Sequence, residues 1–209
     1  MIPHAAPPGP VGIAQEHPFD APRFEAAVAE MLAAAGFSPA LHHVRSTPAR
    51  VRELWEKRLL NGYTVDVAAA LGSGFEDPGK DAVIIRGIAV HGMCPHHLVP
   101  FRGVAHVSYI PGGRLHGFGR VARLVDALCH RLTYQERFTR DVVEALMVHG
   151  AAAGAACQVE AEQLCLLLGE DRRGDERVVT QAFAGSYGGD TPEAASRRRE
   201  FLAALSGGR

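Results

Sequence analysis

The sequence lacks the features that mark membrane, secreted and strongly charged proteins. It contains no apolar run as long as the roughly 18 residues that a transmembrane helix needs. Its N-terminus has no basic stretch followed by an apolar core, so we do not interpret it as a signal peptide. Four cysteines among 209 residues are too few for a disulfide scaffold, and a net charge of -1 attracts neither nucleic acid nor membranes. We therefore expect a reduced, cytoplasmic protein that binds neither nucleic acid nor membranes.

The length fits one domain preceded by an arm. Residues 1–19 carry five prolines and read as a flexible arm. Residues 20–63 form an N-terminal helical segment, in which Asp20 and Thr47 are candidate caps of two successive helices. After a loop rich in glycine, aspartate and proline, residues 82–209 are expected to form the main domain.

Within that domain, β-rich segments bounded by turn residues alternate with pairs of amphipathic helices. Strands are expected at 82–88, 104–110, 157–161, 164–168 and 178–183, and helices at 119–131, 134–149 and 193–205. Thr133 and Glu136 have the spacing of a capping box at the start of the second helix. Paired strands with helices segregated between them predict an α+β fold with an antiparallel sheet.

The sharpest local signal is Cys94-Pro95-His96-His97 at the end of a β segment. Thiolate and imidazole are the ligands that zinc prefers, although the histidines can also be a surface pair and Cys94 a buried apolar residue. A third ligand is needed, and Cys165 in an apolar β segment is the best candidate. Two other cysteines compete for this role: Cys129, which falls within a helix, and Cys157, at the edge of a strand.

The number of protein ligands decides what such a site does. Three ligands leave one position for water, as in a catalytic zinc site, where the metal lowers the pKa of that water to about 7. If both histidines and two cysteines bound the ion, the site would be closed and structural.

Several ordered segments resemble the GTP cyclohydrolase I family, a member of the tunnelling-fold group, over residues 24–205. The segments that carry this resemblance are Thr47–Val51 with Trp55 and Gly62-Tyr63, Met93–Phe101, Gly103–Pro111, Gln135–Arg137 with Thr139, Val179-Thr180 and Arg199–Leu202. The resemblance implies a ββααββ core preceded by an N-terminal helical hairpin. It also implies a ring-shaped homo-oligomer, pentamers stacked in pairs, with sites at subunit boundaries.

The resemblance implies roles for individual residues. Cys94, His97 and Cys165 match the metal ligands, and His96 matches a proton-transfer histidine. The remaining matches are to substrate contacts: Glu136, with Gln135 beside it, for the guanine edge, and Arg120 and Arg123 for the phosphates. Alone, Glu136 could instead be the capping-box glutamate, and the two arginines could be solvated surface residues.

The sequence departs from the family pattern around the substrate. Gln163 stands where the family has a histidine, and an amide cannot shuttle a proton near neutral pH. Gly169 stands where the family has a phosphate-binding arginine, and Arg172 and Arg173 are too far along the chain to replace it directly. Pro95 replaces an acidic residue and Gly119 a serine.

These departures lead to three hypotheses. The first is a zinc-dependent hydrolase that opens the imidazole ring of a guanine-type purine by attack of zinc-bound water at C8, and that is not optimised for GTP. The second is orthodox GTP cyclohydrolase I activity, which converts GTP to dihydroneopterin triphosphate and formate. The third is a catalytically silent ring subunit that binds a purine or pterin.

Overall fold

A computed structural model of the chain describes residues 13–38, 40–169 and 176–206. Of the expected arm at 1–19, only residues 13–19 fall within this part. Arg172 and Arg173 lie outside the described residues. No helix in these described ranges is long and apolar enough to cross a lipid bilayer.

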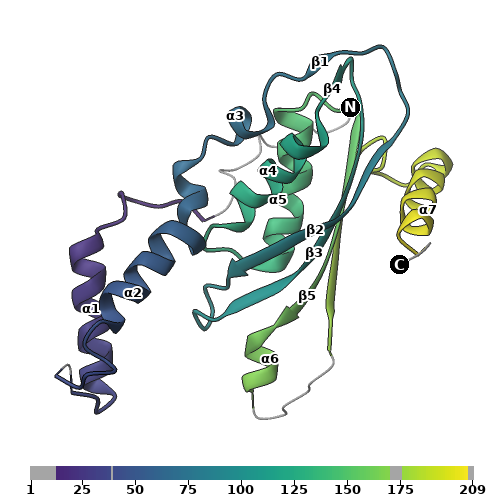
Figure 1. Cartoon of the computed structure of the whole chain (residues 1–209). Coiled ribbons are helices and arrows are strands. Elements are labelled where there is room, and N and C mark those ends of the chain that lie inside the picture. The colour runs from purple at the N-terminus through teal and green to yellow at the C-terminus, as the bar shows by residue number, and fades with distance from the viewer. Residues whose placement is uncertain (1–12, 39, 170–175, 207–209) are drawn as a thin grey trace.

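The N-terminal region is helical, as the sequence predicts. Helices α1 (Ala21–Ala34) and α2 (Thr47–Leu54) lie side by side (Figure 1). Asp20 caps α1 by accepting a hydrogen bond from the backbone N–H of Arg23. The expected cap at Thr47 is wrong by one position: Thr47 is the first residue of α2 and Ser46 precedes it without a side-chain cap.

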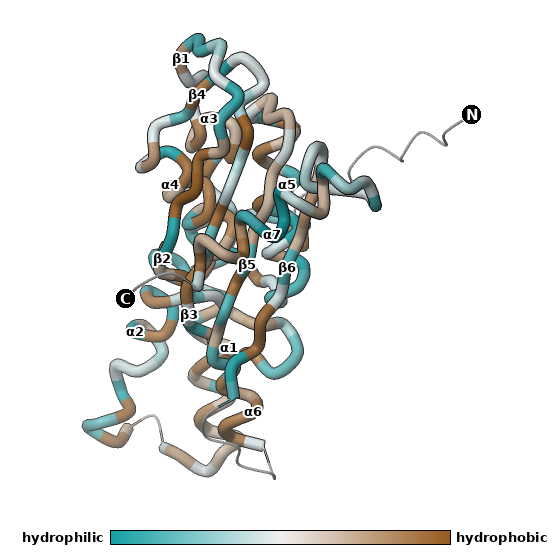
Figure 2. The backbone as a smooth tube through the Cα atoms, turned by 90° about the vertical axis from the view of Figure 1, so that its right-hand side faces the viewer, coloured by the Kyte–Doolittle hydropathy of each residue, from teal (hydrophilic) through white to brown (hydrophobic). Residues whose placement is uncertain are grey.

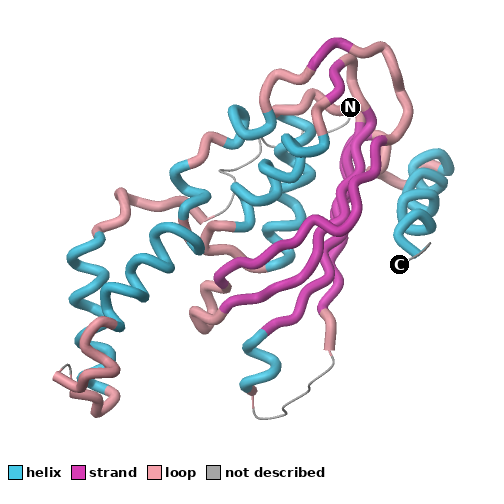
Figure 3. Tube along the Cα trace, viewed as in Figure 1, coloured by secondary structure: helices cyan, strands magenta, loops and turns pink. Residues whose placement is uncertain are grey.

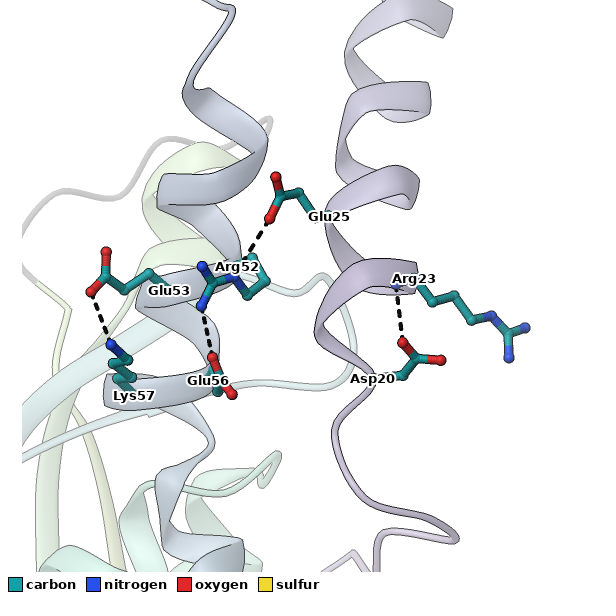
Figure 4. Close-up of polar contacts among 7 residues, drawn as sticks. All are labelled: Asp20, Arg23, Glu25, Arg52, Glu53, Glu56 and Lys57. Carbon is teal, nitrogen blue, oxygen red and sulfur yellow. Dashed lines mark hydrogen bonds and ion pairs between the residues drawn. The ribbon is translucent and has the colours of Figure 1, made fainter.

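Arg52 joins the two helices. Its Nη1 lies 2.9 Å from Glu56 Oε2 on its own helical run, and its Nε lies 3.6 Å from Glu25 Oε2 of α1 (Figure 4). Because these side chains are partly exposed, water and salt screen both pairs, and they contribute little to stability. The chain then continues through three short helical elements: η1 (Trp55–Leu59), η2 (Asn61–Thr64) and α3 (Val67–Leu71).

An antiparallel sheet forms the centre of the molecule (Figure 3). Its order is β2-β3-β5-β6, with bounds Val83–Met93, Pro100–Ile110, Gly154–Gln163 and Val178–Gly185. A separate two-stranded ladder joins β1 (Phe75–Glu76) to β4 (Arg114–Leu115).

The register of the sheet brings the two candidate metal-binding cysteines to the same end. Met93 pairs with Pro100, and the next residue, Phe101, pairs with Gln163. Cys94 follows β2 directly, and Cys165 comes two residues after β5. We call this end of the sheet the cysteine end, and the end at which Ile110 pairs with Gly154 the opposite end.

Two helices cover one face of the sheet, and α7 (Pro192–Ser206) lies on the other (Figure 1). Helix α4 (Phe118–Cys129) starts at the opposite end and finishes at the cysteine end, where the Cys129 thiol donates to the His91 carbonyl. Helix α5 (Gln135–Val148) starts at the cysteine end and returns. Apolar residues of the strands and of both helices form the core, and the hydrophobic stretches of the strands and of α4 are brown in Figure 2. The core includes Phe101, Val107, Leu124, Phe138, Leu146 and Val159.

One expected strand is a helix. Residues Leu164–Leu168 form α6, not a strand. Gln163 pairs with the second residue of β3, so almost no neighbouring strand remains for residues beyond it. Leucine favours helices, and a short apolar run cannot be assigned by periodicity alone. Apart from this segment, the ββααββ order is confirmed as β2, β3, α4, α5, β5 and β6, in an α+β fold.

Candidate metal and substrate site

Cys94 lies in the tight turn between β2 and β3. The Cys94 N–H donates to the Val99 carbonyl and the Leu98 N–H donates to the Cys94 carbonyl, with Leu98 in the left-handed region at φ 53°. These bonds fix the direction of the Cys94 side chain, which is only 6% exposed. Its sulfur lies 3.6 Å from His96 Nδ1, and both His96 and His97 are exposed.

Cys165 occupies the first turn of α6 and is partly exposed. Its two competitors, Cys129 and Cys157, are both buried. Burial raises the pKa of the Cys129 and Cys157 thiols far above the usual range, so both stay protonated at neutral pH. Cys157 also lies in the middle of β5, away from the cysteine end.

The donor types at the cysteine end fit zinc, because two thiols and an imidazole are a common ligand set of that ion. The structure brings Cys94 and Cys165 to one end of the sheet, because they follow β2 and β5, the two strands that flank β3. It does not draw the donors into a finished cluster: over the described residues, no three His, Cys, Asp or Glu side chains are grouped to hold a metal.

Gln135 is committed to the protein itself. Its side chain is buried, and its Nε2 donates to the carbonyls of Val159 on β5 (3.1 Å) and Val178 on β6 (2.8 Å). Its Oε1 accepts a hydrogen bond of 2.6 Å from Gln163 Nε2. Both amide protons are therefore used, and Gln135 fastens the start of α5 to the sheet. Gln163, which stands where the family has a histidine, supplies the donor for the remaining polar atom of the Gln135 side chain.

Glu136 is not the glutamate of a capping box. The N-cap of α5 is Tyr134 and has no side-chain cap, while the Thr133 hydroxyl donates to the Tyr134 carbonyl. Glu136 is exposed in the first helical turn, where the positive end of the helix dipole favours a carboxylate. The His96 ring lies nearly parallel to the Tyr134 ring, 6.0 Å away between centroids. Tyr134 was not among the site residues expected from the sequence, and only its position next to Gln135 points to it.

Within one chain, Arg120 and Arg123 lie far from the site residues at the cysteine end. Both are exposed near the start of α4, at the opposite end of the sheet. Since α4 has 12 residues, its ends are about 18 Å apart at about 1.5 Å per residue. A Cβ added at Gly119 would meet no atom within 4 Å, so the missing serine leaves open space beside Arg120.

Comparison with known proteins places these features in a family. The model of the GTP cyclohydrolase I family matches residues 24–205. The chain is 59% identical over 196 residues to "GTP cyclohydrolase 1" of Ralstonia nicotianae, covering 94% of this chain and 92% of that one. It is 61% identical over 188 residues to "GTP cyclohydrolase 1" of Chromobacterium violaceum, covering 90% and 89%. The protein of the same name from Mycobacterium ulcerans is 41% identical over 181 residues, covering 86% and 88%.

Proposed function

This chain belongs to the GTP cyclohydrolase I family, and on that premise we propose that it converts GTP to dihydroneopterin triphosphate and formate. The supporting observation is the identity of 59% and 61%, over about nine-tenths of the chain, to two proteins named GTP cyclohydrolase 1. This favours the orthodox activity over a hydrolase that is not optimised for GTP.

The proposed metal centre uses Cys94, His97 and Cys165, with zinc as the cofactor. Zinc, when bound by three protein ligands, supplies a water of lowered pKa near neutral pH. His96, beside the Cys94 sulfur, is the group that moves protons at the reacting ring.

In this proposal, Gln163 does not replace the family histidine as a proton carrier. Its amide donates to Gln135, and an amide does not titrate near neutral pH. Gln163 therefore acts as a positioning residue: it holds Gln135, which is bonded to two strands and directly precedes Glu136. Glu136 accepts hydrogen bonds from the ring N–H and the exocyclic amine of the guanine.

The phosphate contacts come from a second copy of the chain. Arg120 and Arg123 lie at the opposite end of the sheet from Glu136, so they cannot reach a substrate bound there in the same chain. This proposal requires a closed homo-oligomeric ring in which the start of α4 of one copy lies against the cysteine end of the next. We propose such a ring, pentamers stacked in pairs, with each site shared between copies.

A second candidate function is ring opening without efficient closure to a pterin. It is favoured by Gln163, which removes one proton carrier, and by Gly169, which removes a guanidinium next to the metal segment. A positioned acid or base is worth about 10²–10⁴ in rate, so its loss could stop the reaction early.

One experiment separates the candidates. The zinc-loaded assembly is incubated with GTP, formate is quantified, and the pterin is detected by fluorescence after oxidation. Formate and pterin in equal amounts support the orthodox reaction, whereas formate without pterin supports the second candidate. Binding of GTP with neither formate nor a ring-opened product detectable by mass would refute both, and would leave a silent ring subunit. Cys94→Ala is the matched control, in which turnover should disappear.

A further inference from the structure

A pair of histidines faces one another beside the cysteine end, and the proposed reaction does not use it. His91 lies on β2, and His130 is the C-cap of α4. Their Nε2 atoms are 2.9 Å apart, and their ring centroids are 4.4 Å apart with the planes tilted by 54°. His91 is exposed, whereas His130 is 8% exposed, so solvent reaches the pair from the His91 side.

The contact between the two Nε2 atoms is not a straight hydrogen bond. In a straight N–H···N bond, each ring centre lies about 1.1 Å behind its nitrogen, which would put the centroids about 5 Å apart. The observed 4.4 Å means that the two rings do not point straight at one another. Two imidazole nitrogens about 2.0–2.1 Å from one metal ion are about 2.9 Å apart at a right angle and about 3.3 Å apart at a tetrahedral angle. The measured 2.9 Å separation therefore suits two ligands of a single ion at about a right angle, and the two nitrogens would have to move apart by about 0.4 Å to reach the tetrahedral spacing of zinc.

The surroundings of His130 prepare its Nε2 as an electron-pair donor. Its other ring nitrogen, Nδ1, lies 3.6 Å from Asp126 Oδ1, one helical turn earlier on α4. A carboxylate at one nitrogen favours the proton there and leaves the other nitrogen free to bind metal, which is the usual arrangement around metal-ligating histidines. Burial, more than any charge, lowers the pKa of His130, so the ring is neutral near pH 7.

His91 is held in place by its backbone and by its strand. Its carbonyl accepts a bond of 2.9 Å from the Cys129 thiol, which ties β2 to the end of α4. Its register partner on β3 is Arg102, whose guanidinium is paired with Glu162 at 2.7 Å. That pairing reduces the repulsion between Arg102 and a cation bound at His91.

We propose that His91 and His130 bind one divalent transition-metal ion, zinc in the first instance, at a site distinct from Cys94, His97 and Cys165. The described residues supply no third His, Cys, Asp or Glu to a metal cluster here, so water or an external ligand fills the other positions. Imidazole is a good ligand for zinc, and also for copper and nickel. The ion would join β2 to α4 at the point where the histidine pair already touches.

The test is the number of zinc ions that the full-length assembly binds per chain in equilibrium dialysis. His91→Gln should bind one ion fewer per chain than the wild type, since an exposed position tolerates glutamine. His149→Gln, a matched change at the exposed C-cap of α5, should leave the number unchanged. His130→Gln should also bind one zinc ion fewer per chain. If this variant fails to fold, the zinc content of His91→Gln is sufficient to test the proposal.

Cobalt separates this site from the cysteine site. Cobalt bound by thiolates has an intense sulfur-to-metal charge-transfer band, which a histidine–water site lacks. We expect His91→Gln to keep that band while losing one cobalt per chain, and Cys94→Ala to lose the band while keeping the ion at His91. Equal zinc in the wild type and His91→Gln would overturn the proposal. So would a single ion that is lost in both His91→Gln and Cys94→Ala.

Discussion

Replacing Gln163 tests the bond that fastens helix α5 to the sheet. Gln163→Leu removes the donor to Gln135 Oε1 and keeps most of the side-chain volume. Gln135 cannot turn its amide to compensate, because its Nε2 already donates to the Val159 and Val178 carbonyls. The variant therefore leaves an acceptor without a donor in a residue that is 3% exposed.

The expected cost follows from that burial. A buried polar group left unpaired costs about 1–3 kcal/mol. In a chain of this size each kcal/mol shifts Tm by about 2–4 °C, so Gln163→Leu should lower Tm by about 2–12 °C. Gln163→Glu should cost more, because a carboxylate would face the Gln135 oxygen without a proton to share. Gln163→His restores an N–H donor and should cost least.

The assay is thermal unfolding of the variants at one fixed protein concentration, since assembly makes Tm depend on concentration. Kinetics on GTP provide a second measurement. If Gln163 positions Glu136 through Gln135, Gln163→Leu should raise KM more than it lowers kcat. Leu and Glu variants as stable as the wild type would refute the reasoning. A large gain in kcat in Gln163→His would instead place residue 163 in the proton path.

The metal, the base contact and the assembly each have a direct test. Cys165→Ala should abolish the cobalt–thiolate band, and a band of full intensity would assign the third ligand elsewhere. Glu136→Gln should weaken GTP binding about 10- to 100-fold, from the loss of about 1.5–3 kcal/mol of charged hydrogen bonding, with helix content by circular dichroism unchanged. If only thermal stability fell, Glu136 would not contact the base. Mixed assemblies of Cys94→Ala chains with Arg120→Ala/Arg123→Ala chains should recover turnover, because each site needs one intact half from each copy. Verified mixing without activity would contradict shared sites.

Much of the fold was predictable because its signals are local. Apolar periodicity located α4 and α5, and Asp20 marked the start of α1. Turn residues marked the boundaries between strands, so the order ββααββ could be read without knowing any long-range contact. The donor residues at Cys94 and the ordered motifs of the family are also local patterns, and they led to the correct family.

The length of a strand is set by its neighbours. β5 runs over Gly154–Gln163 because β3 offers a pairing partner along that length, and the leucines that follow turn into α6 where the partner ends. The capping-box spacing of Thr133 was misleading for a similar reason. The start of α5 is fixed by Gln135 bonding to two strands, not by a side-chain cap.

The sequence by itself determined which chemical groups this protein has and in what order its helices and strands follow. The tertiary structure decided which of those groups meet. It joined Gln163 to Gln135, placed Arg120 and Arg123 at the far end of α4 from Glu136, and brought His91 against His130 across 39 positions. Such contacts depend on strand register and helix direction. Both are set by packing between segments far apart in the chain, which no local pattern records.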